Sequence, residues 1–204
     1  MYRNLTTVIL LMLLITDSVT YVSAQGAGQK PSRWTDVMYE QYTYNNYTDY
    51  TAFVEPIDLT AIDTELLEAA IFYETNRQRA THERAPLMYD HNLRMCAHNH
   101  SADMTELNFF DHNSPVAGKE TFYDRLEQVG YKDYTCAENI VMCTLKASYA
   151  ETARYMVEEK WMKSKGHRTN ILRTSLTHLG CGASVYRENG NWYVKATQNF
   201  LKKL

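Results

Sequence analysis

Apolar residues recur at helical spacing in several parts of the chain. One stripe belongs to a helix that we expect to run to about Arg79, and it consists of Ile62, Leu66, Leu67, Ala70 and Ile71. Similar stripes predict helices over 93–107, over 122–129 with an end at Gly130, and over about 148–164. Each stripe must be buried against another element, because an apolar helix face is not stable in water.

Alternating or continuous apolar runs predict strands over 139–143, 177–186 and 191–201. The last two are joined by Glu188-Asn189-Gly190-Asn191, and Asn-Gly between two apolar runs is a strong signal of a β-hairpin. Helices before and between the strands must cover both faces of the sheet. The pattern therefore predicts an α+β fold, a three-layer α-β-α sandwich with a small antiparallel sheet between helices.

The first 24 residues have the pattern of a secretory signal peptide. The apolar run 8–15 is followed by small residues up to Ala24, where cleavage is expected. This run is shorter than the roughly 20 apolar residues that span a bilayer, and no later stretch approaches that length. We therefore expect a secreted, extracellular protein with no integral membrane segment after signal removal.

Residues 25–57 are polar and rich in tyrosine, without lasting helical or strand periodicity. We interpret them as a mobile leader or linker, or as an arm that packs onto the domain predicted over 58–204. A further hypothesis makes this segment the working part of a structural extracellular protein, cross-linked or docked to a partner. Beyond the predicted signal peptide, glycosylation sequons are present at Asn46 and at Asn99, and Asn46 is the better candidate because Asn99 falls within a predicted helix.

Four cysteines in a secreted chain suggest two disulfides, and Cys96, Cys136, Cys143 and Cys181 allow three connectivities. A bond from Cys136 to Cys143 needs a turn between them, because the ends of an extended strand of that length lie about 23 Å apart. Zinc ligation by the four cysteines has the wrong spacing. The formal net charge of -3, with no basic stripe, gives no indication of nucleic-acid binding.

Three polar residues lie where predicted elements begin or end, which is where side chains can converge on a cleft. They are His112, Glu138 and His167. Two imidazoles and a carboxylate could hold a zinc-like divalent metal with one position left for water. Spacing alone is weak support among seven histidines, of which His100 lies on an apolar helix stripe and is expected to be a core residue.

The segments around these residues resemble the signature blocks of the CAP superfamily, in the family's order along the chain. They read Phe109-Phe110-Asp111-His112-Asn113-Ser114-Pro115, Ala137-Glu138-Asn139-Ile140 and Trp161-Met162-Lys163-Ser164-Lys165-Gly166-His167-Arg168-Thr169-Asn170-Ile171-Leu172, followed by Leu179-Gly180-Cys181-Gly182 and Thr197-Gln198-Asn199-Phe200. That superfamily includes cysteine-rich secretory proteins, insect venom antigens and plant pathogenesis-related proteins, and this chain looks most like its compact bacterial type.

The resemblance implies an α-β-α sandwich and a cleft of two histidines and two glutamates that binds divalent metal in some members. His112, Glu138 and His167 match three of these positions, whereas Ser164 stands where animal members carry the second glutamate. The site is then a three-residue metal site or a polar, hydrogen-bonded cleft. Nearby residues are expected to be structural. Trp161 would pack a helix on the sheet, Asn139 and Asn170 would tie loops, Gly166 would allow a turn, and Arg168 would lie on the surface.

Two classes of function follow. The first is a secreted binding module whose cleft holds a sterol or other lipid, a glycan or a protein. The alternative is an extracellular hydrolase, either metal-dependent through His112, Glu138 and His167 or nucleophilic through Ser164 and a histidine. No strained nucleophile turn such as Gly-x-Ser-x-Gly is present, so binding is the leading hypothesis.

Overall fold

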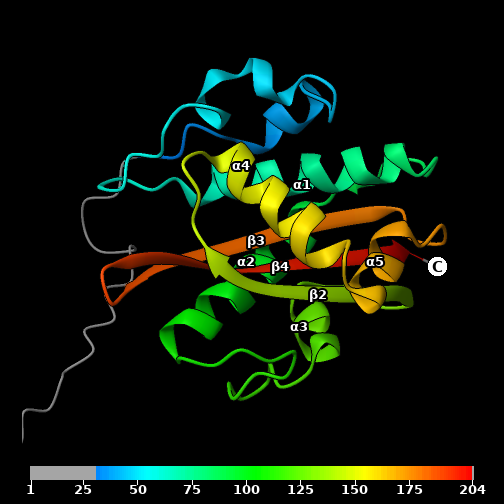
Figure 1. Ribbon diagram of the computed structural model, residues 1–204. Coiled ribbons are helices and arrows are strands. Elements are labelled where there is room, and N and C mark those ends of the chain that lie inside the picture. Colours follow the sequence, from blue (N-terminus) through cyan, green and yellow to red (C-terminus); the bar gives the residue numbers. More distant parts are fainter. Residues whose placement is uncertain (1–30, 204) are drawn as a thin grey trace, which may run out of the picture.

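A four-stranded sheet forms the middle layer of the structure, a computed structural model that describes residues 31–203 (Figure 1). The strand order is β1-β3-β4-β2. Strands β2 (Tyr134–Thr144), β3 (His178–Glu188) and β4 (Asn191–Lys203) are antiparallel. The sequence analysis missed β1 (Met88–Tyr89), which pairs with β3 in parallel, because two residues are too short to show alternation. The predicted signal peptide lies outside the described residues.

The predicted hairpin is confirmed. Strands β3 and β4 pair from His178 opposite Leu201 to Glu188 opposite Asn191. Asn189 and Gly190 form the turn with φ of 48° and 82°, the backbone region that asparagine and glycine tolerate best.

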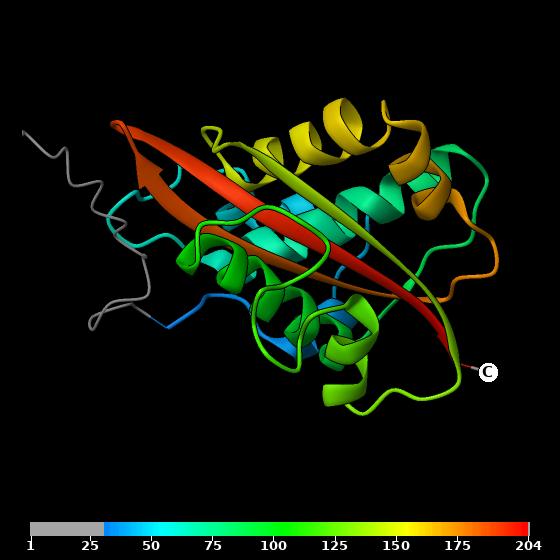
Figure 2. The same cartoon turned by 90° about the horizontal axis from the view of Figure 1, so that it is seen from below.

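Helices cover both faces of the sheet (Figures 1 and 2). Helices α1 (Thr64–Thr81) and α4 (Tyr149–Arg154) lie on one face, and α2 (His91–Glu106) and α3 (Phe122–Gln128) lie on the other. This arrangement confirms the predicted α-β-α sandwich. No helix within residues 31–203 is long and apolar enough to cross a membrane.

Helix α2 packs unusually close to β3, and two glycines make this possible. A Cβ atom on Gly180 would lie 2.0 Å from the backbone nitrogen of Arg94, and one on Gly182 would lie 2.1 Å from the backbone of Ala97. Either contact would overlap backbone atoms that cannot move aside. The Leu-Gly-Cys-Gly motif is therefore the surface on which α2 rests.

The predicted helix over 148–164 is in fact divided. Helix α4 continues as a π-helical segment, η4 (Tyr155–Trp161), and the chain then starts a new helix, α5 (Lys165–Leu172). Trp161 is fully buried and its Nε1 donates to the carbonyl of Ile140 at 3.0 Å, which confirms its predicted packing role. Gly166 lies inside α5 rather than at a turn, so the role predicted for it is wrong.

The described part of the tyrosine-rich segment, residues 31–57, packs against α1. It contains the short 3-10 helices η1 (Asp36–Glu40), η2 (Tyr47–Asp49) and η3 (Thr51–Phe53). Trp34, Tyr47 and Phe53 are at most 2% exposed and belong to the main core. An arm packed on the domain therefore describes these residues better than a mobile leader. The domain boundary at residue 58 stays a prediction.

All four cysteines are free thiols, so the expectation of two disulfides is wrong for this structure. Cys136 and Cys143 lie at opposite ends of β2. Cys143 and Cys181 both belong to the main core. Cys143 lies opposite Val194 of β4, and Cys181 lies opposite Gln198 of the same strand. These two positions of β4 are about 13 Å apart. That separation exceeds the reach of a disulfide. Burial raises the pKa of the Cys96 thiol to about 12, which keeps it protonated.

Candidate functional site

Three of the predicted site residues converge although they come from different elements. His112 lies in the loop between α2 and α3, Glu138 lies in β2, and His167 lies in the first turn of α5. Figure 1 shows β2 passing between α3 and α5, which brings the elements that carry these residues together. Burial, followed by the charge of His112, lowers the pKa of His167, so the two imidazoles influence each other electrostatically.

The Glu138 carboxylate is buried and engaged on several sides. His112 Nδ1 donates to Glu138 Oε1 at 2.8 Å. Arg125 Nη2 lies 3.0 Å from Oε1 and 2.8 Å from Oε2, and both side chains of this ion pair are only 3% exposed. With its amide nitrogen facing the carboxylate, Asn199 donates to Oε2 at 3.2 Å. The charge of Glu138 is therefore compensated inside the protein.

Arg125 is the site residue that the sequence analysis missed. Beyond Glu138, it donates to the carbonyls of His112 at 3.0 Å and Lys119 at 3.2 Å. A capping box between Thr121 and Asp124, the residue before Arg125, fixes the start of α3. The sequence held an indication of this role. Arg125 follows Phe122 by three residues, so it places a charged side chain next to the predicted apolar stripe of the helix.

The loop that carries His112 is also held from the core. His100 is fully buried, and its Nε2 donates to the carbonyl of Asp111 at 3.1 Å. Burial lowers the pKa of His100 to about 4, so this imidazole stays neutral. Its prediction as a core histidine is confirmed. His100 and Arg125 thus bind consecutive carbonyls, those of Asp111 and His112.

Side-chain amides hold His167 and α5 against the strand that carries Glu138. Asn139 Nδ2 donates to the carbonyl of His167 at 3.2 Å, and Asn170 Nδ2 donates to the carbonyl of Glu138 at 3.3 Å. Asn170 also donates to Asn139 Oδ1 at 2.9 Å. The predicted role of both asparagines in tying loops is confirmed, and their bonds join α5 to β2. Arg168, half-buried rather than fully on the surface, donates to the carbonyl of Met162 at 2.9 Å.

Ser164 is the residue that precedes α5, and its side chain makes no capping hydrogen bond there. Glu158 and Glu159, which precede Ser164 in the chain, do not replace the glutamate that other family members carry at the position of Ser164. Glu158 pairs with Arg77 at 2.5 Å, and Glu159 pairs with Lys163. The position of the second family glutamate is therefore not filled by a carboxylate from η4.

These residues do not fit a divalent metal ion. Across residues 31–203, no group of three or more histidine, cysteine, aspartate or glutamate side chains is arranged to hold one. The Arg125 guanidinium, 2.8 Å from Glu138 Oε2, already supplies the positive charge that this carboxylate needs and would repel a second cation. Zinc ligation by His112, Glu138 and His167 stays a prediction without support from this geometry.

The two imidazoles differ in their preferred charge state. The hydrogen bond to Glu138 raises the pKa of His112, whereas burial, followed by the charge of His112, lowers the pKa of His167. The His112 side chain is 51% exposed. Since its Nδ1 faces Glu138, its Nε2 is left for a ligand.

The sequons have different surroundings. Asn46 is half-buried at the start of η2, and its Oδ1 accepts from the backbone nitrogen of Thr43 at 2.8 Å. Asn99 is exposed on α2, but Ser101 of the same sequon is buried and bonded to Thr197 Oγ1 at 2.9 Å. Glycosylation at both positions stays a prediction.

Comparison with known proteins identifies the family. The sequence model of the cysteine-rich secretory protein family, CAP, matches residues 72–200. The uncharacterized protein YkwD of Bacillus subtilis is 34% identical over 148 residues, which are 72% of this chain and 50% of that protein. The uncharacterized membrane protein YlbC of the same organism is 36% identical over 67% of this chain and 34% of its own length. The chain belongs to the CAP family, and it spans half or less of these relatives.

Solved structures agree with this assignment. An extracellular protein with an SCP domain from Bacillus anthracis is 30% identical, with a TM-score of 0.55 over 70% of this chain and 42% of that one. An outer surface protein of Borrelia burgdorferi has a TM-score of 0.53 over 70% of this chain and 97% of its own, at 15% identity. The second likeness shows the shared fold alone.

Proposed function

We propose that this CAP-family protein is secreted and acts as an extracellular binding module, with a cleft between His112 and His167 that holds an acidic group of its ligand. The observation that carries the proposal is the buried pair of Arg125 and Glu138. Because Arg125 compensates Glu138, the carboxylate does not repel an anion that approaches the two imidazoles.

The start of α5 adds to this preference. The first backbone N–H groups of a helix have no partners within the helix, and the helix dipole places partial positive charge there. Ser164 does not cap this end with its side chain, and His167 projects from its first turn. A carboxylate or phosphate would therefore meet two imidazoles and a helix N-terminus, a recurrent anion-binding arrangement.

Extracellular action is supported by a relative and by the sequence. The Bacillus anthracis protein, 30% identical to this chain, is described as extracellular. The first 24 residues have the pattern of a signal peptide. The acidic group could belong to a glycan, a lipid head group or a protein side chain, whereas a neutral sterol would leave the imidazoles without an anion to bind.

The test is a titration of inorganic phosphate and of acetate into the protein, followed by the NMR signals of the histidine rings. We expect saturable shifts at His112 and His167 that disappear in His112→Ala and His167→Ala. The control is His82→Ala, because His82 is exposed at the end of α1 and bonds only to the carbonyl of Gln78. Shifts of equal size in all three variants would contradict an anion site in the cleft.

One contact favours a second candidate, a hydrolase. His112 Nδ1 is oriented by Glu138 at 2.8 Å, which is how a carboxylate prepares an imidazole to act as general base through its other nitrogen. The metal-dependent form of this candidate would need a ligand set that the described residues do not form. A screen of ester and peptide substrates on wild type and His112→Ala tests it, and turnover lost in the variant would favour this candidate over binding alone.

A further inference from the structure

A separate hollow lies apart from the histidine site. It is a pocket of about 430 Å³ bounded by residues 36–44, the middle of α1 and residues 86–89. None of His112, Glu138 and His167 lines it. In Figure 1 the segment at 31–57 lies above α1, whereas the histidine site lies at β2, between α3 and α5. A volume of this size suits a small ligand.

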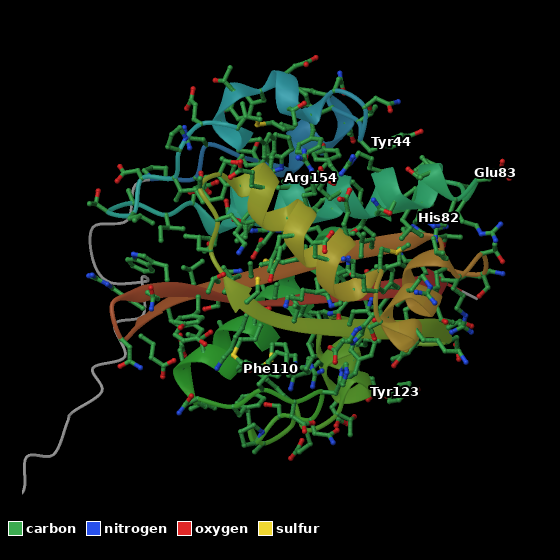
Figure 3. The ribbon with its side chains drawn as sticks, in the orientation of Figure 1. Tyr44, His82, Glu83, Phe110, Tyr123 and Arg154 are labelled. Carbon is green, nitrogen blue, oxygen red and sulfur yellow. The ribbon has the colours of Figure 1, made fainter. Side chains whose placement is uncertain are left out.

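Aromatic rings form a large part of the pocket wall. Six of its lining residues are aromatic: Tyr39, Tyr42, Tyr44, Phe72, Tyr73 and Tyr89. Tyr39 stacks on Tyr89 at 3.7 Å, and Phe72 meets both rings edge to face, so this wall is rigid. Figure 3 shows the Tyr44 side chain at the outer edge of the segment. The pocket thus combines a fixed aromatic wall with more exposed rings at its opening.

The charges around the pocket have one sign. Asp36 and Glu40 line it, and its lining includes no lysine, arginine or histidine. Asp36 accepts from the Tyr89 hydroxyl at 2.6 Å and faces His91 Nδ1 at 2.5 Å. Glu40 is exposed and forms no ion pair or side-chain hydrogen bond with any residue in 31–203. Glu40 therefore retains an uncompensated negative charge at the pocket.

Two basic residues just outside the pocket, Arg94 and His91, are already paired. Arg94 acts on the Tyr39 hydroxyl electrostatically, but its guanidinium is held by Glu65 at 2.9 Å and by Glu68 at 2.7 Å. His91 is held by Asp36. Neither Arg94 nor His91 is therefore free to neutralise Glu40.

We propose that this aromatic pocket binds an organic ammonium cation. Ring faces attract cations through their quadrupole, and several rings with a nearby carboxylate form the usual site for quaternary ammonium groups. A neutral acyl chain would use the rings but gain nothing from Glu40. An anion would be repelled by both carboxylates. The chemistry of this pocket is thus the opposite of that proposed for the histidine cleft.

The test compares choline with 3,3-dimethylbutan-1-ol, its uncharged carbon isostere, by calorimetric titration of the full chain. The two probes have the same shape, so the difference between them measures the effect of charge. We expect saturable choline binding and at least about tenfold weaker binding of the isostere, as a cation–π contact in a partly dry pocket predicts. Equal binding of both probes, or no saturable binding of choline, would overturn the proposal.

Variants locate the site. Glu40→Gln removes one exposed charge without disturbing the core and should weaken choline binding about fivefold. Tyr44→Leu removes a ring that makes no stacking contact with another described ring and should weaken it further. Glu106→Gln, an exposed charge at the end of α2, and His112→Ala in the cleft are the controls, and both should bind choline like the wild type. Unchanged binding in Glu40→Gln and Tyr44→Leu would show that choline binds elsewhere and would refute the assignment.

Two sources can supply the cation, a free small molecule or the head group of a lipid. Vesicles of phosphatidylcholine and of phosphatidylglycerol distinguish them. Retention of the protein on the phosphatidylcholine vesicles alone, lost in Tyr44→Leu, would identify the lipid head group as the ligand. Binding of choline without retention on vesicles would assign the free cation. Preferential retention on the phosphatidylglycerol vesicles, lost in Tyr44→Leu, would contradict a cation site.

Discussion

The molecule carries two different kinds of site. At β2, between α3 and α5, the histidine site depends on a buried ion pair, Arg125 with Glu138, and on single hydrogen bonds to the loop at His112. On the α1 face, the pocket depends on packed rings, with Trp34, Phe53 and Tyr73 in mutual contact at its back. Charge compensation therefore stabilises the first site, and aromatic packing stabilises the second. Each should therefore respond to a different kind of substitution.

The largest effect is expected for Arg125→Ala. This change leaves the Glu138 carboxylate, 3% exposed, without its main partner, and breaking one side of a buried ion pair costs about 3–5 kcal/mol of unfolding free energy. Urea denaturation measures the loss. The double variant Arg125→Leu with Glu138→Leu should recover most of it, because no buried charge then remains. A loss below about 1 kcal/mol in the single variant would mean that the ion pair does not hold the cleft.

Trp34→Ala tests the packed face. Trp34 is 2% exposed, and its removal should cost about 3 kcal/mol, at the lower end for a buried aromatic because its Nε1 has no hydrogen-bond partner among the described residues. Denaturation followed by aromatic circular dichroism measures the change. An unaltered free energy of unfolding would show that residues 31–57 are an appendage and not part of the fold.

Acid should destabilise the cleft face through His100. The pKa of His100 is lowered from 6.5 to about 4 by burial, so the unfolded chain binds a proton that the folded chain does not. Stability therefore falls as the pH drops from 6.5 to about 4, by up to about 3 kcal/mol. His98, with a pKa raised by Glu68, acts in the opposite sense, since its contribution is present at low pH and lost as the pH rises.

The comparison with His100→Gln isolates this effect, because glutamine can still donate to Asp111 but does not titrate. Urea denaturation of both proteins over this pH range measures it. The variant should lose less stability than the wild type on acidification. Parallel pH profiles would assign the acid sensitivity to other groups.

The smallest effect is expected for Lys163→Ala. The side chain of Lys163 is 67% exposed, and that of its partner Glu159 is 47% exposed. Water screens the pair, so it contributes less than about 0.5 kcal/mol to the free energy of unfolding. The same denaturation experiment measures it. A cost above about 1 kcal/mol would break the distinction between buried and exposed ion pairs on which the account depends.

The layers of the fold were predictable because they follow from periodicity. Apolar stripes located α1, α2 and α3, and the Asn189-Gly190 turn located the β3–β4 hairpin. The division of the fourth helix was not predictable, because the π-helical segment keeps Trp161 buried without an obvious change in residue pattern. The packing of residues 31–57 was also hidden, since its tyrosines are buried by α1 and not by a regular element of their own.

The site was predictable in its residues but not in its chemistry. Motif spacing singled out His112, Glu138 and His167, and the structure brings them together. Whether Glu138 is free to bind a metal depends on Arg125, which lies 13 residues away in the chain and meets it only after α3 packs on the sheet. The free cysteines have the same cause, because their distances are set by strand register rather than by composition.

The most direct test of the central claim, that Arg125 and not a metal ion compensates Glu138, is a calorimetric titration of zinc into metal-stripped protein. The wild type, His112→Ala and His167→Ala should be measured side by side. The account predicts no saturable zinc binding that depends on these two histidines. Saturable binding by the wild type that both substitutions abolish would contradict it and would restore the metal site.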